Sequence, residues 1–177
     1  SLHICETMEE IKYIKEKYGM TPIELLKKYN LLNENVLLVH CNYLNEIDYK
    51  LMKESNVSVA VCHSSNLKLQ NNPCKIEKLL QHGINVMIAT DGPATADSLS
   101  LLENLKISAL ISNVEEQTLF DMITINPAKY MKINTGSIIK ENKADLLFYK
   151  KDDLNFTYTQ SIINNLIYLT PNNPELI

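Results

Sequence analysis

The chain has 177 residues, enough for a domain with a hydrophobic core. Hydrophobic residues make up 45% of the sequence and charged residues 21%, proportions that are typical of a folded globular protein rather than a disordered one. A formal net charge of −4 provides no basic field for nucleic acid or an anionic membrane, and no apolar run reaches the roughly 18 residues of a spanning helix. We therefore expect neither nucleic acid nor membrane as a partner.

The first part of the chain alternates predicted strands and helices. A short strand ends at His3, and a helix is expected over about 7–18. A second helix begins at a Thr21-Pro22-Ile23-Glu24 capping box, which has proline at the first helical position. The apolar run 35–40 predicts a strand buried on both faces, and a helix over about 45–55 follows it.

The alternation continues through the middle of the chain. Residues 57–61 predict a strand, and a polar loop then leads to a helix over about 73–82. Residues 85–90 predict the next strand, and another loop leads to a helix over about 99–112. Two shorter helices are expected at 115–124 and 127–131. Strands and helices in this order are typical of a parallel sheet covered by helices.

The last forty or so residues differ in character. Residues 136–139 and 144–149 predict short strands joined by a turn. The shift in composition near Thr135 is the candidate domain boundary, so the sequence divides into an α/β part over 1–134 and a second part over 135–177.

Side chains with useful chemistry follow the predicted strands. His3, His40 and Asp91 each stand at the end of a strand, and the third strand runs into Cys62-His63-Ser64-Ser65-Asn66. The carboxyl ends of parallel strands converge on one face, both in a β/α barrel and in a doubly wound sheet. We therefore expect these side chains to meet at one edge of the sheet.

Each candidate also has an ordinary structural explanation. His3 with Glu6 could supply a metal ligand and a proton carrier, or simply be a strand-end histidine and a helix-start glutamate. His40 could equally be a buried, hydrogen-bonded histidine. For Asp91 the functional explanation is favoured over a structural one, because a carboxylate after a fully apolar strand is costly to bury unless it is paired or binds a metal. His63 and His82 are weaker candidates, and His82, at a helix end where a cation is favoured, is expected to be structural.

The cysteines show no C-x-x-C spacing, and the chain is too long and ordinary in composition for a disulfide-stapled miniprotein. We expect reduced thiols and a cytoplasmic protein.

An ordered series of short motifs resembles the amidohydrolase superfamily. The series comprises Leu2-His3-Ile4-Cys5-Glu6-Thr7, Leu38-Val39-His40-Cys41, Ser64-Ser65-Asn66-Leu67-Lys68-Leu69, Ala89-Thr90-Asp91-Gly92, Asn126-Pro127-Ala128, Gly136-Ser137-Ile138 and Lys143-Ala144-Asp145-Leu146. The resemblance is greatest to the branch of methylthioadenosine/S-adenosylhomocysteine deaminases, chlorohydrolases and guanine deaminases. It implies the last half of a TIM-like (β/α) barrel, about strands five to eight, plus the start of a small β-sandwich.

The resemblance assigns roles to four residues. His3 resembles the family's metal-binding histidine on the fifth strand, and Glu6 the carboxylate that carries a proton to the substrate ring. His40 resembles the sixth-strand histidine, which contacts the substrate or the metal-bound water. Asp91 resembles the eighth-strand aspartate, which binds the metal and takes a proton from the bound water. The implied cofactor is one divalent metal, zinc or iron, and the implied substrate is an aminated purine- or pyrimidine-like ring.

The sequence also departs from the family pattern. His63 stands where relatives often have proline, and Thr95 where many have serine, which puts the substrate in doubt more than the chemistry. The family's first strand carries a His-x-His pair of metal ligands, but the histidines here are never two residues apart. A complete barrel needs about 250 residues. We therefore expect a half barrel that is inactive alone and pairs with a missing N-terminal half or with another copy of the chain.

The sequence alone leaves three alternative functions open. The first is removal of a different leaving group, such as chloride. The second is a catalytically inactive half barrel that serves in assembly. The third is a doubly wound nucleotide-binding domain, which is disfavoured because neither G-x-G-x-x-G nor G-x-x-x-x-G-K-[ST] occurs.

Overall fold

A four-stranded parallel sheet forms the centre of the protein. The computed structural model describes residues 1–96, 98–150 and 161–169. Its strands pair in chain order, and they are β1 (Leu2–Ile4), β2 (Leu37–His40), β3 (Ser58–Val61) and β4 (Asn85–Ile88). All three pairings are parallel, with His3 beside Val39 and Val39 beside Ala60. The predicted order and direction of the strands are confirmed.

Helices connect the strands, and their boundaries follow local capping signals. Between β1 and β2 lie α1 (Met8–Tyr18) and α2 (Pro22–Lys28), and the second begins with the predicted capping box at Thr21. Between β2 and β3 lies α3 (Glu46–Glu54), capped by the side chain of Asn45 as expected. Between β3 and β4 lie α4 (His63–Lys68) and α5 (Ile76–Gln81).

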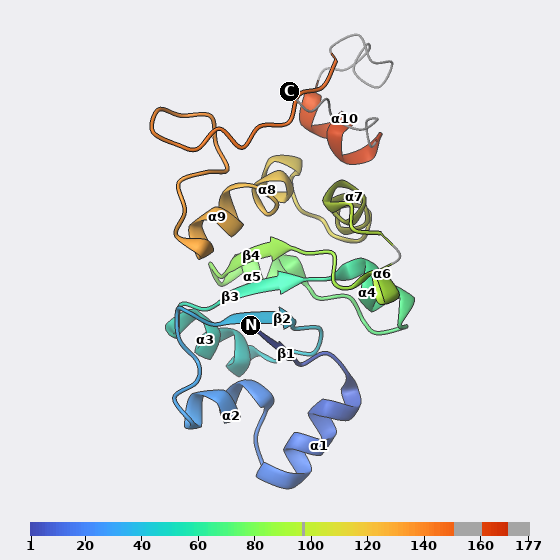
Figure 1. Ribbon diagram of the computed structural model, residues 1–177. Coiled ribbons are helices and arrows are strands. Elements are labelled where there is room, and N and C mark those ends of the chain that lie inside the picture. The colour runs from blue at the N-terminus through green and yellow to red at the C-terminus, as the bar shows by residue number, and fades with distance from the viewer. Residues whose placement is uncertain (97, 151–160, 170–177) are drawn as a thin grey trace.

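The remaining helices follow β4. They are α6 (Pro93–Ala96), α7 (Leu101–Ile111), α8 (Glu116–Asp121), α9 (Ile125–Met131) and α10 (Ile162–Tyr168). Figure 1 shows α7, α8 and α9 beyond the β4 edge of the sheet, with α10 packed against α7 and α8, while α1 and α2 lie beyond β1. Within the described residues no helix combines the length and apolar character needed to cross a bilayer.

Burial increases from β1 towards the middle of the sheet. Every residue of β3 is buried, and Leu38, Val59 and Val86 are wholly inaccessible. These side chains make the continuous apolar runs that a parallel sheet covered on both faces requires. In β1, by contrast, Leu2 and His3 are exposed, and within the described parts of the chain β1 is an edge strand that pairs with β2 alone.

Two segments that we expected to be loops contain short helices, α4 and α6. Their sequences are polar or small and have no strong helix propensity. In α4 the side chains of His63, Ser65 and Asn66 are all buried and hydrogen-bonded, so tertiary contacts hold the helix in place. A propensity argument could not detect this.

The strands expected at 136–139 and 144–149 do not form in the described residues, apart from one bridge residue at Phe148. Ile138 and Ile139 are 89% and 65% exposed, so within the described residues this segment packs against no sheet. Two isolated strands are marginal in water, which explains why the local pattern is not sufficient. Of the remaining residues of the expected second part, 161–169 contain α10, which packs against α7 and α8, while 151–160 and 170–177 lie outside the described residues.

Candidate active site at the carboxyl ends of the strands

The backbone turns sharply where strands β1 and β2 end and just after β4. Cys5, His40, Cys41 and Asp91 all have positive φ, between 52° and 74°. Non-glycine residues rarely adopt this conformation, and such residues cluster at functional sites. Backbone hydrogen bonds hold the turns, including one from Cys41 N–H to the Ile4 carbonyl at 3.1 Å. The sharp turns direct the strand-end side chains into one region.

His3, Glu6 and His40 form a compact group there. Among the described residues, this is the set of histidine, cysteine and acidic side chains whose ligand atoms all lie within 4.8 Å of one another. The rings of His3 and His40 meet edge to face with centroids 4.9 Å apart, and Nε2 of His40 lies 3.8 Å from Glu6 Oε2. His40 is buried, Glu6 half-buried and His3 exposed. Two strands thus bring together three of the four predicted site residues.

Glu10 fixes the turn that carries Glu6. Its carboxylate accepts two backbone hydrogen bonds, from the N–H groups of Cys5 and Glu6, both at 2.9 Å. Charge-assisted bonds of this kind are about twice as strong as neutral ones. Glu10 was not among the residues predicted from the sequence, although the spacing Thr7-x-x-Glu10 matches a capping box and is a visible signal.

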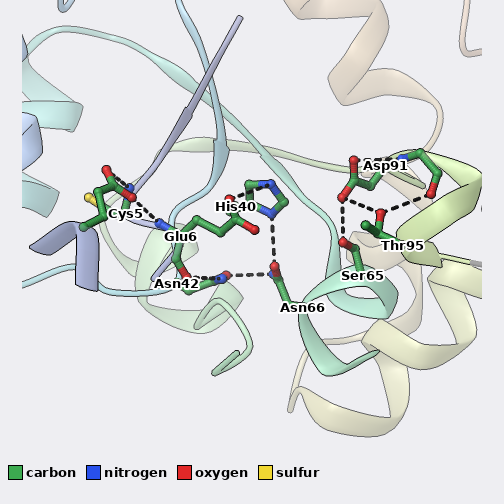
Figure 2. Close-up of polar contacts among 10 residues, drawn as sticks. Cys5, Glu6, His40, Asn42, Ser65, Asn66, Asp91 and Thr95 are labelled. Carbon is green, nitrogen blue, oxygen red and sulfur yellow. Dashed lines mark hydrogen bonds and ion pairs between the residues drawn. The ribbon is translucent and has the colours of Figure 1, made fainter. Parts of the chain in front are cut away.

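Asp91 lies at the same edge of the sheet, beyond β4, and has its own set of donors (Figure 2). Its Oδ2 accepts from the hydroxyls of Ser65 at 2.6 Å and Thr95 at 3.1 Å, and its Oδ1 accepts from Gly92 N–H at 2.8 Å. Burial raises the pKa of the Asp91 carboxyl, but these hydrogen bonds and the nearby His40 outweigh it and hold the pKa below its usual value. Asp91 is therefore a carboxylate, though it is not a member of the group of His3, Glu6 and His40.

Two asparagines position His40, one by direct contact and the other through the first. Its Nδ1 lies 3.0 Å from Asn66 Oδ1, and Asn66 Nδ2 donates to Asn42 Oδ1 at 2.8 Å. Asn42 Nδ2 in turn donates to the backbone carbonyl of Glu6 at 3.0 Å. Figure 2 shows this chain of amides running beneath Glu6 and His40. The sequence motifs include Asn66 without giving it a contact, and neither Asn42 nor the role of Ser65 was predicted from the sequence.

His63 and His82 lie apart from the candidate site, as expected. His63 is buried between Ser108 Oγ and the carbonyl of Cys74, each 3.0 Å from one of its ring nitrogens. His82 stacks on Tyr49 with ring centroids 4.9 Å apart. Both histidines have structural contacts that account for them.

The cysteines do not contribute reactive thiols to this site. All four are free and buried. Burial raises the pKa of the Cys62 thiol to about 12, and it also raises the pKa values of the Cys5, Cys41 and Cys74 thiols. A buried thiol that stays protonated is a poor nucleophile and a poor metal ligand.

The donor set is suited to a divalent metal. Imidazole nitrogens and carboxylate oxygens are ordinary zinc ligands, and catalytic zinc sites use three protein ligands or more. His3 offers an exposed imidazole beside Glu6 and His40, and Asp91 offers a carboxylate at the same edge. Since the chain has no His-x-His pair, the further ligands that the family resemblance implies are not among its residues.

The fold and the site together define a class of protein. A parallel β/α half barrel with histidines and carboxylates at the carboxyl ends of its strands is the framework of metal-dependent hydrolases. Residues 1–174 match the profile of the amidohydrolase family. The chain belongs to this family.

Curated relatives and solved structures agree with this placement. The chain is 32% identical over 176 residues to a 5-methylthioadenosine/S-adenosylhomocysteine deaminase of Thermococcus sibiricus, covering 95% of the chain and 42% of the relative. It is 33% identical to a 5′-deoxyadenosine deaminase of Methanocaldococcus jannaschii, covering 94% of the chain and 42% of the relative. A zinc-bound adenosine deaminase from Xanthomonas campestris superposes with a TM-score of 0.90 at 28% identity, covering 94% of the chain and 40% of that structure. The chain thus spans about two fifths of the length of these relatives.

Proposed function

We propose that this chain supplies one half of the active site of a metal-dependent aminohydrolase that removes an amino group from a purine-like ring. The observation that carries the proposal is the meeting of His3, Glu6 and His40 at the edge where Asp91 also lies. The names of the deaminase relatives support the substrate class.

Each of these residues has a role that fits its surroundings. His3 and Asp91 would hold the metal, with zinc as the proposed ion, and the metal would supply an activated water near neutral pH. Glu6 is half-buried beside His40, which suits a carboxyl that delivers a proton to a ring nitrogen. Asp91, held as an anion by its donors, is able to accept a proton from the attacking water. His40 contacts the reacting group as charge develops.

The site is completed, in this proposal, by a second segment that carries the His-x-His pair. Its partner surface would include the exposed β1 edge and the apolar segment near 138–147, where Ile138 and Leu147 are 89% and 63% exposed. We place the boundary near residue 134, with 135–177 as the start of a β-sandwich that needs strands from the second segment. The buried, free cysteines support reduced thiols and a cytoplasmic location.

The test begins with the gene upstream of the codon for Ser1. We expect it to encode a His-x-His segment, and expression of that segment with residues 1–177 in the presence of zinc to give ammonia release from adenosine-type substrates. His3→Ala and Asp91→Ala should abolish turnover. His82→Ala is the matched control, because it removes a histidine that stacks on Tyr49 outside the site.

Four outcomes would contradict parts of the proposal. Strong ammonia release by residues 1–177 alone would show that no second segment is needed. Activity that survives both His3→Ala and Asp91→Ala would remove these residues from the metal site. Release of chloride from chlorinated rings without ammonia release would favour a chlorohydrolase. No turnover with any ring substrate, together with stable self-association, would favour an assembly role.

A further inference from the structure

We infer that Asn42 and Asn66 are positioning residues that fix the tautomer of His40, so that its Nε2 presents a lone pair to the active site. The inference deepens the proposed function, and rests on it only for the effect on turnover. The structural basis is the buried chain of amides that links the backbone of Glu6 to Nδ1 of His40.

The direction of every bond in this chain follows from one atom, the backbone carbonyl oxygen of Glu6. A carbonyl oxygen can only accept, so Asn42 must present its Nδ2 to it, at 3.0 Å. The Oδ1 of Asn42 then faces Asn66, which must donate from Nδ2, at 2.8 Å. The Oδ1 of Asn66 is left facing His40 Nδ1 at 3.0 Å. Since Oδ1 has no proton, Nδ1 of His40 must carry one.

The other tautomer of His40, with its proton on Nε2, is unfavourable at this position. If Nδ1 lacked its proton, it would face the acceptor oxygen of Asn66, and rotating the Asn66 amide would turn its NH₂ away from Asn42 Oδ1. His40 and Asn66 are 1% and 0% exposed, so water does not replace a lost partner. A buried polar group left without a partner costs about 1–3 kcal/mol. Burial and polarity therefore select a single tautomer.

The consequence appears at the other side of the ring. A neutral imidazole with its proton on Nδ1 has a lone pair on Nε2. This atom lies 3.8 Å from Glu6 Oε2, in the group that His3 completes. His40 can therefore accept a hydrogen bond from water or substrate, or bind a cation, whereas the other tautomer would present an N–H donor. Partners that orient an active-site histidine through its second nitrogen act in the same way.

Helix α4 holds the Asn66 end of this chain of amides in place. Asn66 N–H donates to the Cys62 carbonyl at 3.0 Å, and the preceding residue, Ser65, binds Asp91. His63, three residues before Asn66, is buried against α7 through Ser108. One short helix thus holds two side chains from different strands, His40 at the end of β2 and Asp91 just after β4.

The tautomer can be measured without substrate or metal. In the full protein that contains residues 1–177, histidine-selective ¹⁵N labelling at about pH 8 should show His40 with a protonated, pyrrole-type Nδ1 and a pyridine-type Nε2. The His40→Gln spectrum assigns the signals. A wild-type His40 with its proton on Nε2 would overturn the inference.

Two substitutions at Asn66 separate positioning from simple structural support. Asn66→Leu removes the acceptor and should shift the proton to Nε2, with kcat/KM about 10- to 100-fold lower in the active protein. Asn66→Asp keeps an acceptor for Nδ1–H but loses the donor to Asn42 Oδ1, so it should keep the proton on Nδ1 at a lower stability, with kcat/KM closer to the wild type than that of Asn66→Leu. Persistence of the Nδ1–H tautomer in Asn66→Leu would overturn the inference.

Asn104→Leu is the matched control, because Asn104 is a buried asparagine on α7. It should lower stability without changing the His40 spectrum. A change of tautomer in Asn104→Leu as large as that in Asn66→Leu would show that the spectrum reports general loosening, and would also overturn the inference. An Nδ1–H tautomer in a protein that releases no ammonia would leave the positioning role intact and contradict only the proposed function.

Discussion

Ser65 and Asp91 belong to different strand–helix units, yet the serine hydroxyl donates to the aspartate Oδ2 at 2.6 Å. Ser65 is wholly buried on α4, and Asp91 follows β4. This bond, together with that from Thr95, leaves the Asp91 carboxylate oriented as well as charged. The orientation of the proposed metal ligand thus depends on a residue that does not contact the metal in this proposal.

Replacing Ser65 with alanine should therefore impair function. In the completed enzyme we expect Ser65→Ala to lower metal affinity or kcat/KM by about 10- to 100-fold, the usual effect of losing a partner of a metal ligand. Zinc titration by calorimetry and the ammonia assay measure the two quantities. Ser64→Ala is the control, because Ser64 donates to the Ala96 carbonyl at 3.4 Å and does not touch Asp91. Equal effects of the two substitutions would contradict the role of Ser65.

Glu10 provides a second prediction. Glu10→Gln leaves one oxygen to accept a backbone hydrogen bond but replaces the other acceptor with an NH₂ group, so one of the Cys5 and Glu6 amides loses its partner. We expect the free energy of unfolding to fall by about 1.5–3 kcal/mol, as for a hydrogen bond to a charged group. Urea unfolding measures this change. Glu9→Gln, at the exposed neighbouring position, should have almost no effect, and a similar loss there would indicate a general charge effect.

The sequence predicted the strands and their ends well, because that information is local. The apolar run before His40 and the run before Asp91 specify buried strands, and the parallel arrangement then brings their carboxyl ends to one edge. His3, Glu6 and His40 meet there as expected. Helix caps such as Thr21 and Asn45 were also visible, because each cap depends on residues within one turn.

What the sequence did not predict depends on contacts between distant residues. Asn66 is 26 positions from His40 and Asn42 is 24 positions from Asn66, so no local pattern connects them. Helix α4 is held by the buried contacts of its own polar side chains, and propensity predicted a loop. The strands expected near 138 and 147 have the apolar residues of strands but no sheet to join within the described residues. Secondary structure that requires a distant partner cannot be inferred from its own segment.

Gly136 offers a test of a close backbone approach. A Cβ at this position would lie 2.6 Å from the carbonyl oxygen of Thr124, and φ is +83°. Gly136→Ala should therefore cost more than the roughly 1 kcal/mol that positive φ alone costs an alanine. Gly19→Ala is the matched control, since φ is +72° there and nothing lies within 4 Å of the added carbon. Equal losses of stability in thermal unfolding would contradict the predicted clash.

His63 should make stability sensitive to acid. Burial lowers the pKa of its imidazole below the usual value of about 6.5, and the hydrogen bond to the Cys74 carbonyl and the charge of Glu77 only partly oppose this. The ring is neutral in the folded protein, with Nε2–H donating to that carbonyl, and Nδ1 lies 3.0 Å from the Ser108 hydroxyl oxygen. In the unfolded chain the same imidazole takes up a proton as the pH falls below about 6.5.

The sign of the effect follows from proton uptake. Between the unfolded pKa and the lower folded pKa, the unfolded state binds more protons, so the free energy of unfolding falls as the pH falls through this window. His63→Gln removes the titrating group. At pH 7.5 it should be less stable than the wild type by about 1–3 kcal/mol because of lost hydrogen bonds, and the difference should narrow towards pH 5. Urea unfolding at both pH values measures this difference in the free energy of unfolding, with His82→Gln as the control. A difference that stays constant or widens on acidification would show that folding does not lower the pKa of His63.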